Sequence, residues 1–94
     1  MPLSKDECDK LLVNLSDWHI NEKYDSISRM FEFKNYYKTM AFVNAVAYMA
    51  HKEGHHPELM VTFNKCEVIY TTHAINGLSE NDFICAAKAS DIFE

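Results

Sequence analysis

Histidine is the residue type in this sequence that is best suited to carry out chemistry. The chain has 94 residues and five histidines, and four of these lie between His51 and His73. Histidine is the one side chain whose unperturbed pKa, about 6.5, lets it accept or donate a proton near neutral pH. A histidine cluster therefore predicts general acid–base catalysis, with a bound metal ion as the main alternative.

Two of the histidines, His55 and His56, are adjacent and lie between Gly54 and Pro57. A glycine at this place predicts the left-handed residue that ends a helix, and the proline prevents the helix from continuing. The pair is therefore expected on a rigid corner, where side chains are exposed while their directions are fixed. We predict that both histidines are functional.

A predicted hairpin brings His73 towards the adjacent pair. We take Asn64-Lys65 as the two-residue turn of a hairpin spanning 58–72, although Asn-Lys is a weaker turn signal than Asn-Gly. This register places His56 directly opposite His73, so that both side chains point to one face of the sheet. Two positioned imidazoles can act as a general acid and a general base. A longer loop would cancel this pairing.

A metal site is the competing interpretation of the same cluster. His51 and His55 have the i, i+4 spacing of two zinc ligands on one helix face. Further ligands would come from His56, His73 or Cys66. The segment is not an HExxH motif, because its glutamate comes two residues after the first histidine. We therefore prefer acid–base chemistry and expect no metal.

Three predicted helices and two predicted hairpins must position these residues. A capping box at Ser4 starts a helix over about 5–14, and Asn35 can cap a helix of about 18 residues that ends at Gly54. Ser79 starts a C-terminal helix at a second capping box. The predicted strands cover 18–21, 26–34, 58–63 and 66–72. The order αββαββα predicts an α+β fold, a four-stranded, largely antiparallel sheet with helices packed on one face.

Composition limits the classes of protein to which the chain can belong. Its length fits a single domain, residues 1–94, and 48% hydrophobic residues supply a core. A net charge of −5 without a basic stripe disfavours direct nucleic-acid binding. We expect no membrane contact, because no apolar run approaches the roughly 20 residues of a membrane helix, and the N-terminus does not resemble a signal peptide.

The three cysteines are odd in number and widely spaced, which predicts buried thiols and no disulfide framework. Such thiols fit a reducing compartment. The expected location is the cytoplasm, with the nucleus as a second candidate.

The spaced set of residues around the histidines resembles the pattern of the pterin-4a-carbinolamine dehydratase family. That pattern is a charged residue, three further residues, His-His-Pro, an aromatic residue, another His and a final Asp. The positions that match it in order are His51, His55, His56, Pro57, Phe63, His73 and Asp82. The resemblance covers nearly the whole chain.

The resemblance implies the αββαββα fold and an activity, the dehydration of 4a-hydroxytetrahydropterin to quinonoid dihydropterin in tetrahydrobiopterin recycling. It implies that His56 and His73 are the acid–base pair and that His55 binds or orients the pterin. It implies no metal and no bound cofactor, because the pterin is the substrate. The substrate-binding positions that it implies are Gly54, Pro57, Thr71, Thr72 and Ala74. The residues that it implies as supporting the site are His51, Asp82 and Trp18.

The three supporting residues also have structural interpretations. Asp82 is the third residue of the capping box at Ser79, Trp18 suits a core aromatic, and His51 suits a solvated helix position. Many relatives have carboxylates where this chain has His51 and Gly54. A carboxylate there could orient an imidazole or stabilise its charged form.

The family also implies partners. Some members act as dimerisation cofactors of a homeodomain transcription factor, binding its helices and not DNA. The wide apolar stripe of the helix that ends at Gly54 could serve such a helix or a second copy of the chain, although core packing also explains it. We expect a homodimer or a homotetramer, with a transcription-factor helix as the second candidate partner.

Overall fold

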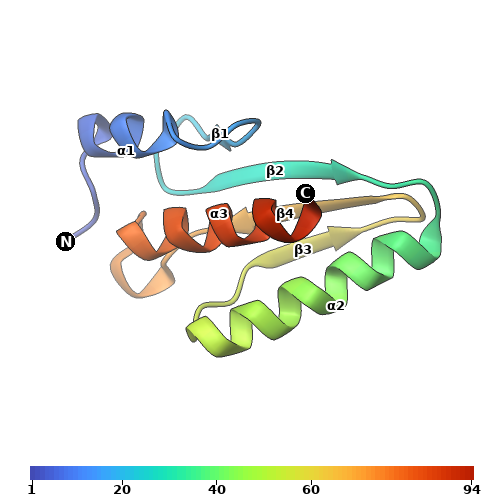
Figure 1. The fold of residues 1–94 in the computed structure, drawn as a ribbon. Coiled ribbons are helices and arrows are strands. Elements are labelled where there is room, and N and C mark those ends of the chain that lie inside the picture. The colour runs from blue at the N-terminus through green and yellow to red at the C-terminus, as the bar shows by residue number, and fades with distance from the viewer.

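The computed structural model describes all 94 residues, and it confirms the α+β fold with a four-stranded antiparallel sheet. Helices α2 and α3 cover one face of the sheet, and α1 lies at one end, next to β1 (Figure 1). The first helix ends two residues earlier than predicted, and all four strands are shorter than predicted. The elements are α1 (Lys5–Leu12), β1 (His19–Ile20), β2 (Ile27–Glu32), α2 (Tyr36–Glu53), β3 (Glu58–Val61), β4 (Lys65–Tyr70), the 3₁₀ helix η1 (His73–Ile75) and α3 (Glu80–Phe93).

The strands are ordered β1-β2-β4-β3, so that β2 and β4 lie in the middle of the sheet. Strand β2 alternates as predicted, with Ile27, Arg29 and Phe31 buried while Met30 and Glu32 are exposed. Successive side chains of a strand point to opposite faces, so the buried set marks the face that α2 and α3 cover (Figure 1).

The turn between β3 and β4 lies one residue earlier than predicted. The amide of Thr62 donates a hydrogen bond to the carbonyl oxygen of Lys65 at 2.9 Å, so Phe63 and Asn64 form the turn. Asn64 also extends the ladder between β2 and β4, because its carbonyl oxygen accepts a hydrogen bond from the amide of Phe33 at 2.8 Å. The predicted turn at Asn64-Lys65 is therefore wrong.

This correction also removes the predicted pairing of His56 with His73. The prediction paired Val61 with Val68, whereas the structure pairs Val61 with Cys66, a displacement of two residues. His73 lies beyond the end of β4, in η1. A displacement of two keeps every strand side chain on its predicted face, because the side-chain period is two. The histidines therefore share the open end of the hairpin without forming a cross-strand pair.

Helix α2 begins and ends at the predicted capping residues. The Oδ1 atom of Asn35 accepts a hydrogen bond from the first turn at 2.9 Å, and Gly54 is left-handed with φ 67°. The amide of His55 then donates to the carbonyl oxygen of Ala50 at 3.1 Å, as in a Schellman motif. This motif holds His55 just beyond the helix end.

Both predicted capping boxes are present. In α1 the amide of Ser4 donates to the Glu7 carboxylate at 2.8 Å, and the amide of Glu7 donates to the Ser4 hydroxyl at 3.2 Å. In α3 the amide of Ser79 donates to Oδ2 of Asp82 at 2.9 Å. The start of α3 is thereby held directly after the segment that contains His73.

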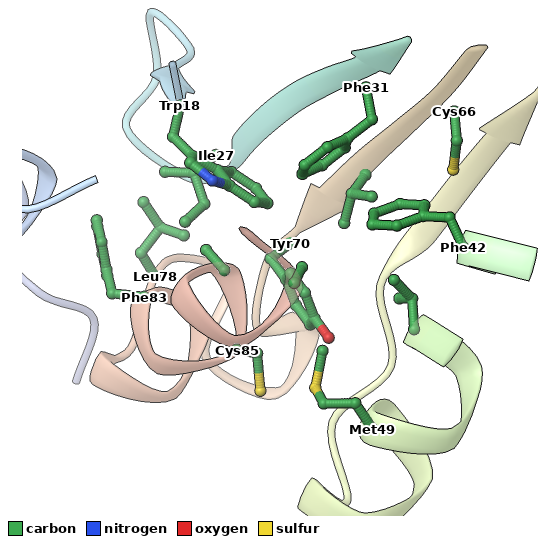
Figure 2. Close-up of a cluster of buried hydrophobic side chains, with 14 of the residues drawn as sticks. Trp18, Ile27, Phe31, Phe42, Met49, Cys66, Tyr70, Leu78, Phe83 and Cys85 are labelled. Atoms are coloured by element: carbon green, nitrogen blue, oxygen red, sulfur yellow. The ribbon is translucent and has the colours of Figure 1, made fainter. Parts of the chain in front are cut away.

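The hydrophobic core fills the space between the sheet and the two covering helices (Figure 2). Phe31 and Tyr70 of the sheet meet Phe42 of α2 and Phe83 of α3 there. All three cysteines are free and buried, as predicted, and burial raises the pKa of Cys66 to about 11. None of the helices combines the length and the apolarity that a membrane span requires.

Candidate active site

A contact between His55 and Asp82 lies at the centre of the candidate site. Nε2 of His55 lies 2.5 Å from Oδ1 of Asp82, and the Asp82 side chain is fully buried. The His55 ring packs on Tyr70 with 5.1 Å between ring centroids. Its side chain keeps 15% of its surface exposed. One edge and one face of the imidazole are therefore held by the protein, and the Nδ1 edge is left for other contacts.

Asp82 joins three separate segments of the chain. Besides His55, which follows α2, it binds Thr72, which follows β4, with 2.7 Å between Oγ1 of Thr72 and its own Oδ2. The same Oδ2 accepts the hydrogen bond from the amide of Ser79 at the start of α3. The capping role predicted for Asp82 is present, and the structure adds a direct contact with a histidine of the cluster.

Two connections of the chain meet at the end of the sheet where β3 begins and β4 ends (Figure 1). The segment 54–57 joins α2 to β3, and the segment 71–74 follows β4. The hydroxyl of Tyr70 donates to the carbonyl oxygen of His55 at 3.3 Å, which ties one connection to the other. Gly54, His56 and Ala74 are exposed here, and Pro57 is half-buried. All eight of the predicted catalytic and substrate-binding positions therefore lie in these two connections.

His73 is exposed beside a hollow of about 300 Å³. Asp25, Glu58, Thr71 and Asn76 contribute to the walls of this hollow. Glu58 pairs with Ile69, whose side chain lies on the opposite face of β4 from the buried Tyr70. The hollow is therefore on the face of the sheet that the helices leave open. The hydroxyl of Thr71 donates to the carbonyl oxygen of Asp25, which closes one side.

The structure does not bring Trp18 and His51 into this arrangement. Trp18 is buried in the core (Figure 2). Its Nε1 donates to the hydroxyl of Ser90 at 2.8 Å, near the C-terminal end of α3. His51 is exposed on the last turn of α2. The prediction that His51 and His55 share a helix face is wrong, because α2 ends at Glu53 and the left-handed Gly54 turns the chain between them.

The donor set required for a metal ion does not converge in this chain. No group of three or more His, Cys, Asp or Glu side chains has an arrangement that could hold one. His55 is directed to a carboxylate rather than to another histidine. Its geometry is that of a hydrogen-bonded imidazole.

Sequence reasoning did not single out Tyr70 or Glu58 for the site. Tyr70 is a fully buried strand residue that supports the His55 ring, and Glu58 is a wall of the hollow beside His73. The alternation of β4 predicts burial of Tyr70, but no local pattern indicates that its ring packs on a histidine. For Glu58, its place two residues after His56 is the available signal.

The family model and the relatives that match this chain carry the same family name. The family model for pterin 4 alpha carbinolamine dehydratase matches residues 1–92. A protein of Nitrosospira multiformis, provisionally named as such a dehydratase, is 57% identical over 93 residues, which cover 99% of this chain and 80% of the relative. A protein of Nitrosomonas eutropha with the same provisional name is 61% identical over 88 residues, covering 93% of this chain and 76% of the relative.

Two solved structures share the fold. A transcriptional coactivator/pterin dehydratase from Brucella melitensis superposes with a TM-score of 0.95 at 31% identity, covering the whole of both chains. A pterin dehydratase-like protein described as a RuBisCO assembly factor in the alpha-carboxysome superposes with a TM-score of 0.70 at 21% identity. That match covers 81% of this chain and 88% of the other, and it concerns the fold alone.

Proposed function

The chain belongs to the pterin 4 alpha carbinolamine dehydratase family, and on that basis we propose that it is a hydro-lyase. Its proposed substrate is a 4a-hydroxytetrahydropterin and its product is quinonoid dihydropterin, in the recycling of tetrahydrobiopterin. The observation that supports this most is the meeting of segments 54–57 and 71–74 at one end of the sheet. These segments carry the histidines that acid–base catalysis requires.

The proposed reaction breaks the bond between C4a and the hydroxyl oxygen of the substrate. A ring nitrogen supplies the electron pair that forms a carbon–nitrogen double bond, and a general acid protonates the departing hydroxide to water. A general base then takes the proton from the cationic ring. Nothing is oxidised or reduced overall, so the reaction needs no redox partner. A positioned acid or base of this kind typically contributes about 10²–10⁴-fold.

In this proposal His56 and His73 are the general acid and the general base. Both are exposed, and each lies in one of the two segments that meet. His55 differs from them because its Nε2 is held by Asp82. It is therefore suited to orient the pterin through its remaining nitrogen, a role that needs a fixed ring.

The pterin itself would lie over the same two connections. Gly54, Pro57, Thr71 and Ala74 are the proposed substrate-binding positions. Gly54 and Ala74 are exposed, so their backbone groups can approach a ligand closely. The hollow beside His73 provides room on the open face of the sheet.

The direct test is the dehydration of synthetic 4a-hydroxytetrahydropterin, followed by ultraviolet absorbance. The purified chain is expected to accelerate the reaction well above the rate in buffer. The product should have the absorbance of quinonoid dihydropterin. A rate equal to that in buffer, from folded protein, would contradict the proposed function.

We propose a second role, as a binding module, for the surface formed by α2 and α3. A hollow of about 390 Å³ lies between these helices, beside Tyr48 and Ile92 and next to an ion pair of Lys88 with Glu53 at 3.2 Å. On α2, the side chains of Tyr37 and Tyr48 are 77% and 67% exposed. The relative from Brucella melitensis is described as a coactivator as well as a dehydratase, which favours a role of this kind.

The proposed occupant of this surface is a second copy of the chain, in a homodimer or homotetramer, with a transcription-factor helix as the alternative. The proposed location is the cytoplasm, and the alternative partner would require the nucleus. Light scattering of the purified protein measures the oligomer directly. Tyr48→Glu places a charge on this surface and is expected to reduce the assembly size. The control is Val13→Glu, because Val13 is an apolar residue at the end of α1 that is 84% exposed. A wild-type protein that is monomeric would contradict the homo-oligomer.

A further inference from the structure

The buried carboxylate of Asp82 has hydrogen-bond partners on both of its oxygens. Oδ1 faces Nε2 of His55 at 2.5 Å. Oδ2 lies 2.7 Å from the hydroxyl of Thr72 and 2.9 Å from the amide nitrogen of Ser79. The Asp82 side chain has no exposed surface, so these protein groups stand in for water.

The direction of each bond follows from the hydrogens available. Thr72 has one hydroxyl hydrogen, and Asp82 accepts it. The hydroxyl of Ser79 lies 2.9 Å from that of Thr72, so Ser79 is the donor to Thr72 in this pair. A carboxylate only accepts, so the Nε2 atom of His55 carries the hydrogen that points to Oδ1. Neutral His55 then has its lone pair on Nδ1.

From this chain of bonds we infer that Thr72 is a positioning residue, whose hydroxyl orients the Asp82 carboxylate so that His55 keeps its hydrogen on Nε2 and presents Nδ1 as an acceptor. Two donors on Oδ2 set the plane of the carboxylate, and this plane aims Oδ1 at the imidazole. Without the hydroxyl, Oδ2 keeps the amide of Ser79 at 2.9 Å, while the Ser79 hydroxyl lies farther away, at 3.5 Å. The carboxylate can then turn, and its hold on His55 weakens.

The family resemblance implies Thr72 as a substrate-binding residue, but the polar groups of Thr72 are already bonded within the protein. Its amide donates to the carbonyl oxygen of Gly77 at 2.9 Å, and its carbonyl oxygen accepts from the amide of Ile75 at 3.2 Å. Its hydroxyl is bonded to Asp82. Any effect of Thr72 on the reaction is therefore transmitted through Asp82 and His55.

The catalytic consequence of this inference rests on the proposed function. A pterin bound at the site would meet Nδ1 of His55 as an acceptor, so the group on the substrate must be a donor such as a ring N–H. The protonation pattern of His55 exists without substrate, which allows the two proposals to be tested separately.

The experiment compares Thr72→Val, which removes the hydroxyl at nearly constant shape, with Thr72→Ser, which keeps it. The exposed Thr62 provides the control variant Thr62→Val. Nitrogen-15 NMR of the substrate-free protein reports which ring nitrogen of His55 carries the hydrogen. The wild type, Thr72→Ser and Thr62→Val are expected to show hydrogen on Nε2. Thr72→Val is expected to show a mixture of the two tautomers.

A second variant keeps the inference testable if Thr72→Val does not fold. In Asp82→Asn an amide NH₂ can face His55 while the amide oxygen accepts from Thr72 and Ser79, so the hydrogen on His55 is expected to move to Nδ1. An unchanged His55 spectrum in folded Thr72→Val would overturn the positioning role. An unchanged spectrum in Asp82→Asn would overturn the assignment of Nε2 as the donor.

The activity assay then separates the two proposals. If the wild type is a dehydratase, kcat/KM should fall about tenfold or more in Thr72→Val, the effect of losing one hydrogen bond to a charged group. Thr72→Ser should restore it. An inactive wild type with the expected spectra would contradict the proposed function alone. An active wild type with full activity in Thr72→Val would overturn the positioning role alone.

Discussion

The hydroxyl of Thr39 on α2 lies 3.0 Å from the carbonyl oxygen of Phe63, in the turn between β3 and β4. It also lies 2.9 Å from the carbonyl oxygen of Asn35, the residue that caps α2. The ring of Tyr36 stacks on that of Phe63 with 6.2 Å between centroids. The start of α2 is thereby joined to the turn. The turn sets the register of β3. These contacts therefore help to fix where segment 54–57 lies relative to segment 71–74, at the other end of the hairpin.

Replacing Thr39 by valine should lower the free energy of unfolding by about 1 kcal/mol, since a hydrogen bond to the turn is lost. In a domain of this size that corresponds to a fall in Tm of about 4–8 °C. Thr39→Ser keeps the hydroxyl and should lose less. Urea unfolding of both variants measures the difference. Equal stability of Thr39→Val and the wild type would show that this contact does not stabilise the turn.

Replacing Gly54 by alanine should also destabilise the fold. Gly54 has φ 67°, and a Cβ at this position would meet no atom within 4 Å, so the cost comes from the backbone alone. A left-handed non-glycine residue costs about 1–2 kcal/mol. Asparagine tolerates this conformation better, so Gly54→Asn should be intermediate in urea unfolding. The free energy of unfolding is expected to rise from Gly54→Ala through Gly54→Asn to the wild type, and any other order would contradict this expectation.

His56→Ala and His73→Ala should each lower kcat of the proposed dehydration by about 10²–10⁴-fold, because each removes an acid or a base. The exposed His19 in β1 provides the control His19→Ala, which should keep wild-type activity. Steady-state rates across pH measure the two titrating groups in the wild type. Full activity in either folded variant would remove that histidine from the acid–base pair.

The stability of the fold should fall as the pH rises from about 9 to about 11. Burial raises the pKa of the Cys66 thiol from 9.0 to about 11. Above pH 9 the unfolded chain releases this proton while the folded chain retains it, so the unfolded state gains relative stability. Below pH 9 both states hold the proton, and the contribution of Cys66 is constant.

Urea unfolding at several pH values checks this expectation, with Cys66→Ala as the comparison. The variant should lose less stability over the same pH interval than the wild type. Part of the decline should remain, because burial also raises the pKa of Cys8, Cys85 and Tyr70. Identical pH profiles for the variant and the wild type would contradict a raised pKa of Cys66.

Much of the fold could be predicted from local sequence patterns. The capping boxes at Ser4 and Ser79, the cap at Asn35 and the left-handed Gly54 are all present. The alternation of β2 correctly predicted its buried face. These features depend on hydrogen bonds and side-chain periods within a few residues, so neighbouring residues suffice to specify them.

The candidate site was predictable in composition but not in geometry. The sequence indicated that His55, His56 and His73 gather near one corner, and the structure brings the segments that contain them to one end of the sheet. It did not predict that His55 would face Asp82 while His73 lies beside a separate hollow. The cross-strand pair of His56 and His73 failed because the turn is displaced by one residue.

The sequence by itself determined the element order, the capping residues of the helices and the buried face of β2, because these follow from short-range backbone hydrogen bonding and from side-chain alternation. Only the tertiary structure decided the register of β3 and the partner of His55. Asn64 joins the ladder of β2, and Asp82 is reached from segments that precede and follow the hairpin. Such contacts are set by how the layers pack, and packing depends on residues far apart in the chain.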